Sequence, residues 1–249
     1  MTALVEDHGR VRQITFSRPE KKNAFDMALY EASGQALQAA LDDDSIHAVV
    51  VTGAGDAFSA GQDLQEMAAM SAGGGEIGKR SEFPAFLSVL QSFHKPLLAA
   101  VNGVAVGIGM TMLSFCDFVY VGESARARVP FVPLGVAPEA ASSLLFPIRM
   151  GWQRAARVLM LGDWVSPAGL VELGLALEVR PDATLLDDTL ALGARIAEGS
   201  LPSLVATKRL MLAADAEPIR EARVREDVAF ARLLHMELPP DHPMAGFET

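Results

Sequence analysis

The chain has 249 residues, of which 50% are hydrophobic, so it can form one large domain or two small ones with a sizeable core. Its formal net charge of −10 argues against general nucleic-acid binding, which favours basic surfaces. No apolar run reaches the length of a membrane span, and a single cysteine excludes an internal disulfide framework. The five histidines are scattered without ligand spacing, so we expect no metal site.

Neither end of the chain carries a recognisable sorting signal. The N-terminal residues lack the basic and then apolar pattern of a signal peptide, and the final three residues are not a peroxisomal tripeptide. The lone Cys116 fits a reducing compartment, and we interpret it as a small buried hydrophobic residue. We therefore expect a cytoplasmic protein.

Strand and helix patterns alternate through the first half of the chain. Residues 11–16 and 48–52 have strand patterns, and apolar residues at helical spacing predict a helix over 26–41. A polar, glycine-rich stretch over 70–76 is the expected mobile loop. The pattern continues with a helix over 83–93, a strand over 97–101, a buried helix over 108–115 and a strand over 118–121. This alternation predicts βαβ units and an α/β fold.

Helical patterns dominate the second half, where strands become sparse after about Gly122. Helices are predicted over 185–196, 204–212 and 218–234. In the last of them, one face can carry Ile219, Ala222, Val228, Ala229 and Leu233 or Leu234. We expect a core over residues 1–195 and a helical region over 196–249. Ordinary core packing explains the leucine-rich tail helices equally well.

Two glycine-containing turns that follow predicted strands are the most informative feature of the chain. Residues 58–64 follow the apolar run over 48–51, and residues 104–110 follow the strand over 97–101. A small-residue turn between strand and helix leaves backbone N–H groups that can bind an oxyanion when a thioester becomes an enolate. The alternative for one such turn alone is a tight bend that needs glycine for a positive φ.

The order and spacing of several segments resemble the crotonase family, the enoyl-CoA hydratases and isomerases. The matching segments are 18–24, 58–64, 99–109, 116–117, 130–135 and 162–174, so the resemblance covers nearly the whole chain. It implies a spiral of ββα units whose C-terminal helices pack over the active site and build a homotrimer or a dimer of trimers. It also implies an acyl-CoA substrate, with CoA as part of that substrate and no metal or redox cofactor.

The resemblance implies an oxyanion hole formed by the N–H groups of Ala60 and Ile108. Hydratases of the family also use two glutamates, at the positions that hold Thr111 and Phe131 here. A hydroxyl and a phenyl ring cannot activate and orient a water molecule as two carboxylates do. Two-glutamate hydratase chemistry is therefore not expected.

A different carboxylate, Glu139, matches the single catalytic glutamate of the enoyl-CoA isomerase branch. We expect Glu139 to open a helix whose N–H groups favour its charged form, while an apolar acyl pocket favours the neutral form. One such base could move a proton from C2 to C4 of a 3-enoyl thioester. The alternative is a first-turn glutamate that complements the helix dipole. Ala140 replaces the glycine usual in this branch, and we expect it to narrow the pocket.

Further residues are expected to bind the CoA part and the acyl chain. Lys22 is the expected cation against CoA phosphates, with a solvated loop lysine as the alternative. Asp63 either lines the groove or caps the following helix. The other expected groove residues are Ala24, Ala60, Gly61, Gln62, Leu64, Gly107 and Phe131. Candidates for the acyl channel are Met67, Met70, Phe83, Phe86, Leu87 and Leu90, for which core packing is the alternative.

The family's C-terminal Phe-Lys-Arg ending, which often reaches the CoA of a neighbouring subunit, is only partly present. Phe247 stands there without a following cation, and we expect Lys208 and Arg209 to be solvated rather than to replace it. We therefore predict an enzyme that isomerises 3-enoyl-CoA to 2-enoyl-CoA. The alternatives are an enoyl-CoA hydratase or other lyase with a different base, and a non-catalytic acyl-CoA-binding module.

Overall fold

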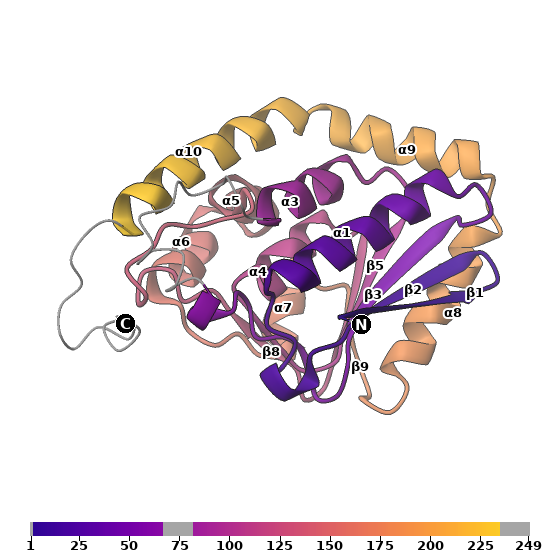
Figure 1. The fold of residues 1–249 in the computed structure, drawn as a ribbon, viewed down its shortest axis with the longest axis horizontal. Helices are drawn as coiled ribbons and strands as arrows, with labels where there is room; N and C mark the ends of the chain where they lie inside the picture. Colours follow the sequence, from indigo (N-terminus) through magenta and orange to yellow (C-terminus); the bar gives the residue numbers. More distant parts are fainter. Residues whose placement is uncertain (1, 67–81, 235–249) are drawn as a thin grey trace.

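A computed structural model describes residues 2–66 and 82–234, with a six-stranded sheet at its centre (Figure 1). The first two strands pair antiparallel, and every later pair in the sheet is parallel. The sheet has the order β1-β2-β3-β5-β7-β9. Its strands are β1 (Ala3–His8), β2 (Val11–Phe16), β3 (Ala48–Gly53), β5 (Leu97–Val101), β7 (Phe118–Gly122) and β9 (Glu178–Arg180).

A second, three-stranded parallel sheet is built from short strands that directly follow strands of the large sheet. Its order is β4 (Ala57–Ser59), β6 (Val104–Val106) and β8 (Arg126–Arg128). Asn102 joins two of the connecting turns, because its side-chain amide donates to the carbonyls of Gly53 at 2.8 Å and Gly55 at 3.0 Å. The repeated step from a long to a short strand confirms the α/β spiral that the resemblance implies.

Helices cover both faces of the large sheet. On one face lie α1 (Met27–Asp42) and α3 (Phe83–Ser92), and on the other lies α8 (Leu185–Ala197). The alternation of side chains along β3 explains this arrangement, since Val49 and Val51 pack in the core with α1 while Val50 packs with α8. A parallel strand buried on both faces reads as a continuous apolar run.

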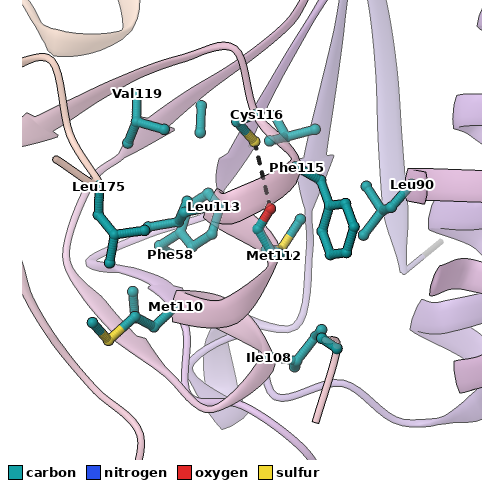
Figure 2. Close-up of a cluster of buried hydrophobic side chains, with 14 of the residues drawn as sticks. Phe58, Leu90, Ile108, Met110, Met112, Leu113, Phe115, Cys116, Val119 and Leu175 are labelled. Atoms are coloured by element: carbon teal, nitrogen blue, oxygen red, sulfur yellow. Dashed lines mark hydrogen bonds between the residues drawn. The ribbon is translucent and has the colours of Figure 1, made fainter. Parts of the chain in front are cut away.

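The expected helix over 108–115 is two shorter pieces, α4 (Ile108–Thr111) and the 3-10 helix η2 (Met112–Phe115), all buried. Figure 2 shows their side chains packed with Phe58 and Leu90 from other elements. The thiol of Cys116 is buried as expected and donates to the Met112 carbonyl at 3.8 Å. Burial raises the pKa of Cys116 to about 12, so the thiol is unreactive at neutral pH.

Most of the remaining helices lie in the second half of the chain. The last two arch over one edge of the molecule (Figure 1). The remaining elements are η1 (Pro19–Lys21), α5 (Ser142–Met150), α6 (Trp152–Leu161), α7 (Pro167–Glu172), α9 (Leu201–Ala213) and α10 (Ala216–Leu234). None of the described helices has the length and apolar character to cross a bilayer. The expected mobile loop over 70–76 and the tail at Phe247 lie outside the described residues.

The expected apolar face of α10 is partly wrong. Ile219 and Ala222 are buried as predicted, but Val228 is 66% exposed. The third buried position belongs to Glu226, which is 5% exposed. A buried carboxylate needs hydrogen-bond partners, and Glu226 finds them on another helix.

Lys208 attaches α9 to the large sheet through a buried ion pair. Its ammonium donates to Asp117 Oδ2 at 2.7 Å and to the Lys95 carbonyl at 2.9 Å.

Lys208→Met would leave Asp117 without its cation, so we expect the free energy of unfolding to fall by about 3 kcal/mol. Urea denaturation measures it, with the exposed neighbour Arg209→Met as control. Equal stability of the two variants would contradict the prediction.

Candidate active site

A cavity of about 700 Å³ lies beside the carboxyl ends of the short strands and is closed on one side by α10. Its wall holds all the predicted catalytic and groove residues except Ala24 and Asp63. The predicted residues that line it are Lys22, Ala60, Gly61, Gln62, Leu64, Gly107, Ile108, Phe131 and Glu139. Segments far apart in the sequence therefore meet at one place.

Ala24 and Asp63 do not line the cavity, so their expected places in the groove remain predictions. Asp63 Oδ1 accepts from the N–H groups of Gln65 at 3.1 Å and Glu66 at 3.4 Å, which is the capping alternative. Arg18 joins the two residues, because it donates to the Ala24 carbonyl and pairs with Asp63. These contacts fix the loop that carries Lys22.

Two glycines let the strand-to-helix turns approach each other. Gly61 and Gly107 have φ values of 95° and 53°, which favour glycine. A Cβ atom on Gly61 would lie 2.8 Å from the Val106 carbonyl oxygen, which is too close for any side chain. A Cβ atom on Gly107 would lie 3.9 Å from Gly61 Cα and 4.0 Å from Glu139 Oε1. The two turns and the carboxyl group of Glu139 therefore converge.

The free N–H groups at these turns differ from the expected pair. The Ala60 N–H donates to the Lys22 carbonyl at 2.8 Å, so the prediction of Ala60 as an oxyanion donor is wrong in this conformation. The Gly61 N–H donates to Ser59 Oγ at 3.1 Å. Within the described residues, the N–H groups of Gln62 and Ile108 have no acceptor. Ile108 therefore stays a candidate oxyanion donor, and Gln62 becomes the second candidate instead of Ala60.

Glu139 does not open a helix, contrary to the prediction. The helix α5 begins at Ser142, and its free N–H groups are occupied by another carboxylate. Glu226 of α10 accepts from the N–H groups of Ala141 at 2.6 Å and Ser143 at 2.8 Å. Glu226 is thus the cap of α5, and this leaves the carboxyl group of Glu139 directed to the cavity.

Burial of Glu139 raises the pKa of its carboxyl group from 4.5 to about 8. The charge of Glu226 raises this pKa further, as does Asp227 to a smaller extent, whereas the Thr111 hydroxyl opposes the shift. A carboxyl group with a pKa near neutral pH can both take and return a proton under physiological conditions. Glu139 therefore has the properties of a general acid–base.

The backbone after Glu139 is strained. Ala140 and Ala141 both have a φ of 56°, a left-handed conformation that costs residues with a Cβ about 1–2 kcal/mol each. Ala140 is buried and does not line the cavity, so the expectation that it narrows the pocket is wrong. Its methyl group affects the backbone conformation instead, which explains why glycine suits this position. The bonds to Glu226 help to hold the strained turn.

The wall near Glu139 is mainly apolar. Of the acyl-channel candidates, Phe83 lines the cavity, whereas Phe86, Leu87 and Leu90 are buried in the core, as in the alternative interpretation. Met67 and Met70 lie outside the described residues. Other apolar wall residues were not predicted, and they include Pro84, Leu134, Val136, Pro138, Phe230 and Ala231. This surface suits a hydrocarbon chain.

The charged groups of the cavity wall include both expected and unexpected residues. Lys22 lies at its edge with a 59% exposed side chain, 3.9 Å from Asp56. Lys208 is buried in its ion pair, contrary to the expected solvated position, and is absent from the cavity wall. The wall residues that were not predicted include Arg126, Arg128, Trp164, Glu226 and Asp227. The alternation of charged and small residues in Arg126-Ala127-Arg128 was the one pattern in the sequence that indicated two arginines on the same face of a strand. In the described ranges, no cluster of three or more potential ligands could hold a metal ion.

The family model described as enoyl-CoA hydratase/isomerase matches residues 6–237. The chain therefore belongs to the enoyl-CoA hydratase/isomerase family, as its residues suggested. It is similar over 95% of its length to a crystal structure of an enoyl-CoA hydratase/isomerase from Pseudoalteromonas atlantica, with 35% identity, 92% coverage of that chain and a TM-score of 0.89. It is also similar to Pseudomonas aeruginosa OdaA, with 34% identity over 99% of this chain and 97% of that one and a TM-score of 0.90.

Relatives with different stated activities are also similar in sequence. Enoyl-CoA delta isomerase 2 of Rattus norvegicus is 40% identical over 73% of this chain and 46% of its own length. The present chain thus spans about half the length of that isomerase. The 2,3-dehydroadipyl-CoA hydratase of Escherichia coli is 32% identical over 94% of this chain and 91% of its own. The family is thereby established, while the comparisons include both isomerases and hydratases.

Proposed function

We propose that this protein isomerises 3-enoyl-CoA thioesters to 2-enoyl-CoA thioesters with Glu139 as its single base. The observation that carries the proposal is the half-buried carboxyl group of Glu139 beside Gly61 and Gly107. Thr111 and Phe131 provide no carboxylate at the two positions that family hydratases use. The similarity to enoyl-CoA delta isomerases supports the same chemistry.

In the proposed reaction, the thioester oxygen accepts hydrogen bonds from the free N–H groups of Gln62 and Ile108. The carboxylate of Glu139 removes a proton from C2, and the electron pair moves to the thioester oxygen as an enolate. The same carboxyl group then gives its proton to C4, which takes up the electrons of the breaking double bond between C3 and C4. The enolate oxygen reforms the thioester carbonyl, and the electrons between C1 and C2 move to form the double bond between C2 and C3. No atom is gained or lost, so one base is sufficient.

We also propose how the rest of the substrate binds. Lys22, at the exposed edge of the cavity, is placed to contact the CoA phosphates. We further propose a spiral core over 1–195 and a helical region over 196–249 that builds a homotrimer or a dimer of trimers. Light scattering of the full chain tests this assembly, and a monomeric mass would contradict it.

Hydratase chemistry is the second candidate, because α10 brings another carboxylate to the cavity. Asp227 lines the wall, and burial raises the pKa of its carboxyl group. Together with Glu139, Asp227 could provide the second carboxylate that water addition requires. A non-catalytic acyl-CoA-binding module is the remaining alternative, and it predicts binding without turnover.

Incubation with a 3-enoyl-CoA in deuterated buffer tests the proposal. The native protein should produce the conjugated 2-enoyl-CoA, measured by ultraviolet absorbance, with deuterium incorporated at C4 where the shuttled proton exchanges with solvent. If the protein forms no conjugated product from the 3-enoyl-CoA but forms 3-hydroxyacyl-CoA from a 2-enoyl-CoA, the hydratase function is correct and the isomerase proposal is wrong. Tight acyl-CoA binding with neither reaction would favour the binding module.

A further inference from the structure

Two arginines and a tryptophan form a cluster on the cavity wall that the proposed reaction does not use. The guanidinium carbons of Arg126 and Arg128 lie 4.4 Å and 4.6 Å from the centre of the Trp164 ring. All three side chains line the cavity that contains Glu139. We call this group the arginine–tryptophan cluster.

The local strand geometry places the cluster at the cavity. Side chains alternate along β8, so Arg126 and Arg128 share one face while Ala127 is fully buried on the other. Ala127 exchanges two backbone hydrogen bonds with Val165, at 3.0 Å and 2.7 Å. This pairing brings Trp164 beside the two arginines, where its ring can hold both guanidinium groups through cation–π contacts.

Neither arginine has an acidic partner in the described part of the chain. No ion pair or side-chain hydrogen bond involves either guanidinium group there, and Arg128 Nε is buried without an acceptor. Two other cations of this acidic protein have acidic partners, since Arg18 pairs with Asp63 and Lys208 with Asp117. A buried donor without a partner is costly, which indicates that an anion from outside the protein completes the cluster.

The strand order indicates which part of the substrate meets the cluster. Lys22 contacts the β4 side of the short sheet through the Ala60 N–H, whereas both arginines lie on β8, at the opposite edge. The free N–H groups of Gln62 and Ile108 follow β4 and β6. A thioester held there with its CoA toward Lys22 directs the acyl chain toward β8, along Phe131 and the apolar wall.

We propose that Arg126 and Arg128 bind a carboxylate at the far end of the acyl chain, so that the substrates are CoA thioesters of dicarboxylic acids. The inference rests on the proposed function, because it deepens the substrate class of that site. The planar guanidinium group binds carboxylates through paired hydrogen bonds, and two such groups fixed on one ring are already oriented for this. The apolar wall accommodates the chain between the two ends.

The test compares two 3-enoyl-CoA substrates of equal chain length, one ending in a carboxylate and one in a methyl group. The native protein should prefer the carboxylated substrate in kcat/KM by about tenfold or more. The double variant Arg126→Gln with Arg128→Gln should lose about 100-fold on that substrate and less than about threefold on the neutral one. Arg195→Gln with Arg209→Gln, which removes two exposed arginines outside the cavity wall, should change neither value.

Binding of the saturated analogues separates this inference from the proposed reaction. Calorimetry should show that the native protein binds the saturated carboxylated acyl-CoA more tightly than the neutral one, and that the double variant loses this difference. This result would support the cluster even if Glu139 catalysed another reaction. Equal losses on both analogues would mean that the cluster binds CoA phosphates, and the proposal would then be wrong. An absence of preference in the native protein would overturn it as well.

Discussion

The variant Glu139→Gln is expected to lose isomerase activity while becoming more stable. A glutamine cannot take a proton from C2, so kcat should fall by about 10³-fold, within the usual range for loss of a general base. The stability gain follows from the pKa of about 8 that Glu139 has in the folded protein, compared with its ordinary value of 4.5. Ionising this half-buried group costs the folded state free energy, whereas the unfolded state has no such cost.

The sign of the pH dependence identifies the cause of the stability gain. Below pH 4.5 the carboxyl group is protonated in both states, so the native protein and the variant should be similarly stable. As the pH rises toward 8, Glu139 ionises in the unfolded state but stays largely protonated in the folded state, so the free energy of unfolding of the unsubstituted protein falls. The variant has no such group and should become more stable than the unsubstituted protein by up to about 4 kcal/mol. Urea denaturation between pH 4.5 and pH 8 measures the difference, with the exposed Glu172→Gln as control. If the free energies of unfolding of the variant and the unsubstituted protein differ by the same amount at every pH in this range, the assigned pKa of Glu139 is contradicted.

The variant Glu226→Gln is expected to weaken the attachment of α10 and to change the pH dependence of catalysis. Glutamine can accept one of the two backbone hydrogen bonds from Ala141 and Ser143, but its NH₂ group opposes the other donor. The free energy of unfolding should therefore fall by about 1–3 kcal/mol. Loss of the negative charge also lowers the pKa of Glu139, because Glu226 raises it in the native protein.

The rate profile distinguishes this effect from a general loss of structure. The carboxylate of Glu139 must be ionised to act as a base, so kcat/KM should rise with pH to about 8 in the native protein and reach its plateau at lower pH in the variant. The other groups that act on Glu139 are Asp227 from α10 and Thr111 from α4, and both are unchanged. Glu221→Gln, exposed on the same helix, is the matched control. An unchanged pH profile would show that Glu226 acts only as a cap.

Local features of the fold could be predicted because they depend on short-range patterns. The helix expected over 26–41 is α1 (Met27–Asp42), since its apolar spacing and the capping side chain of Asp26 are both written in consecutive residues. The strand over 97–101 agrees for the same reason. The strands β4, β6 and β8 were missed because three residues are too few for a pattern to indicate a strand.

The candidate base was similarly accessible from the sequence, because Glu139 lies in a recognisable segment while Thr111 and Phe131 lack carboxyl groups. The oxyanion donors were less accessible. Whether Ala60 or Gln62 has a free N–H depends on which carbonyl lies opposite, and that carbonyl belongs to Lys22, 38 positions before Ala60 in the chain. Residue types do not indicate which backbone groups of distant segments form hydrogen bonds, so the sequence could not predict which N–H group is free.

The sequence by itself determined the family, because the order and spacing of the matching segments are properties of the chain. It also determined the carboxylate expected to act as base and the two glycine turns, because each of these depends on residues that are close together in the chain. Only the tertiary structure decided that Glu226, 85 positions from Ala141, caps α5 and raises the pKa of Glu139. It also decided that Arg126 and Arg128 meet Trp164 at the cavity. Burial and charge interactions depend on distance in space, and folding alone sets that distance.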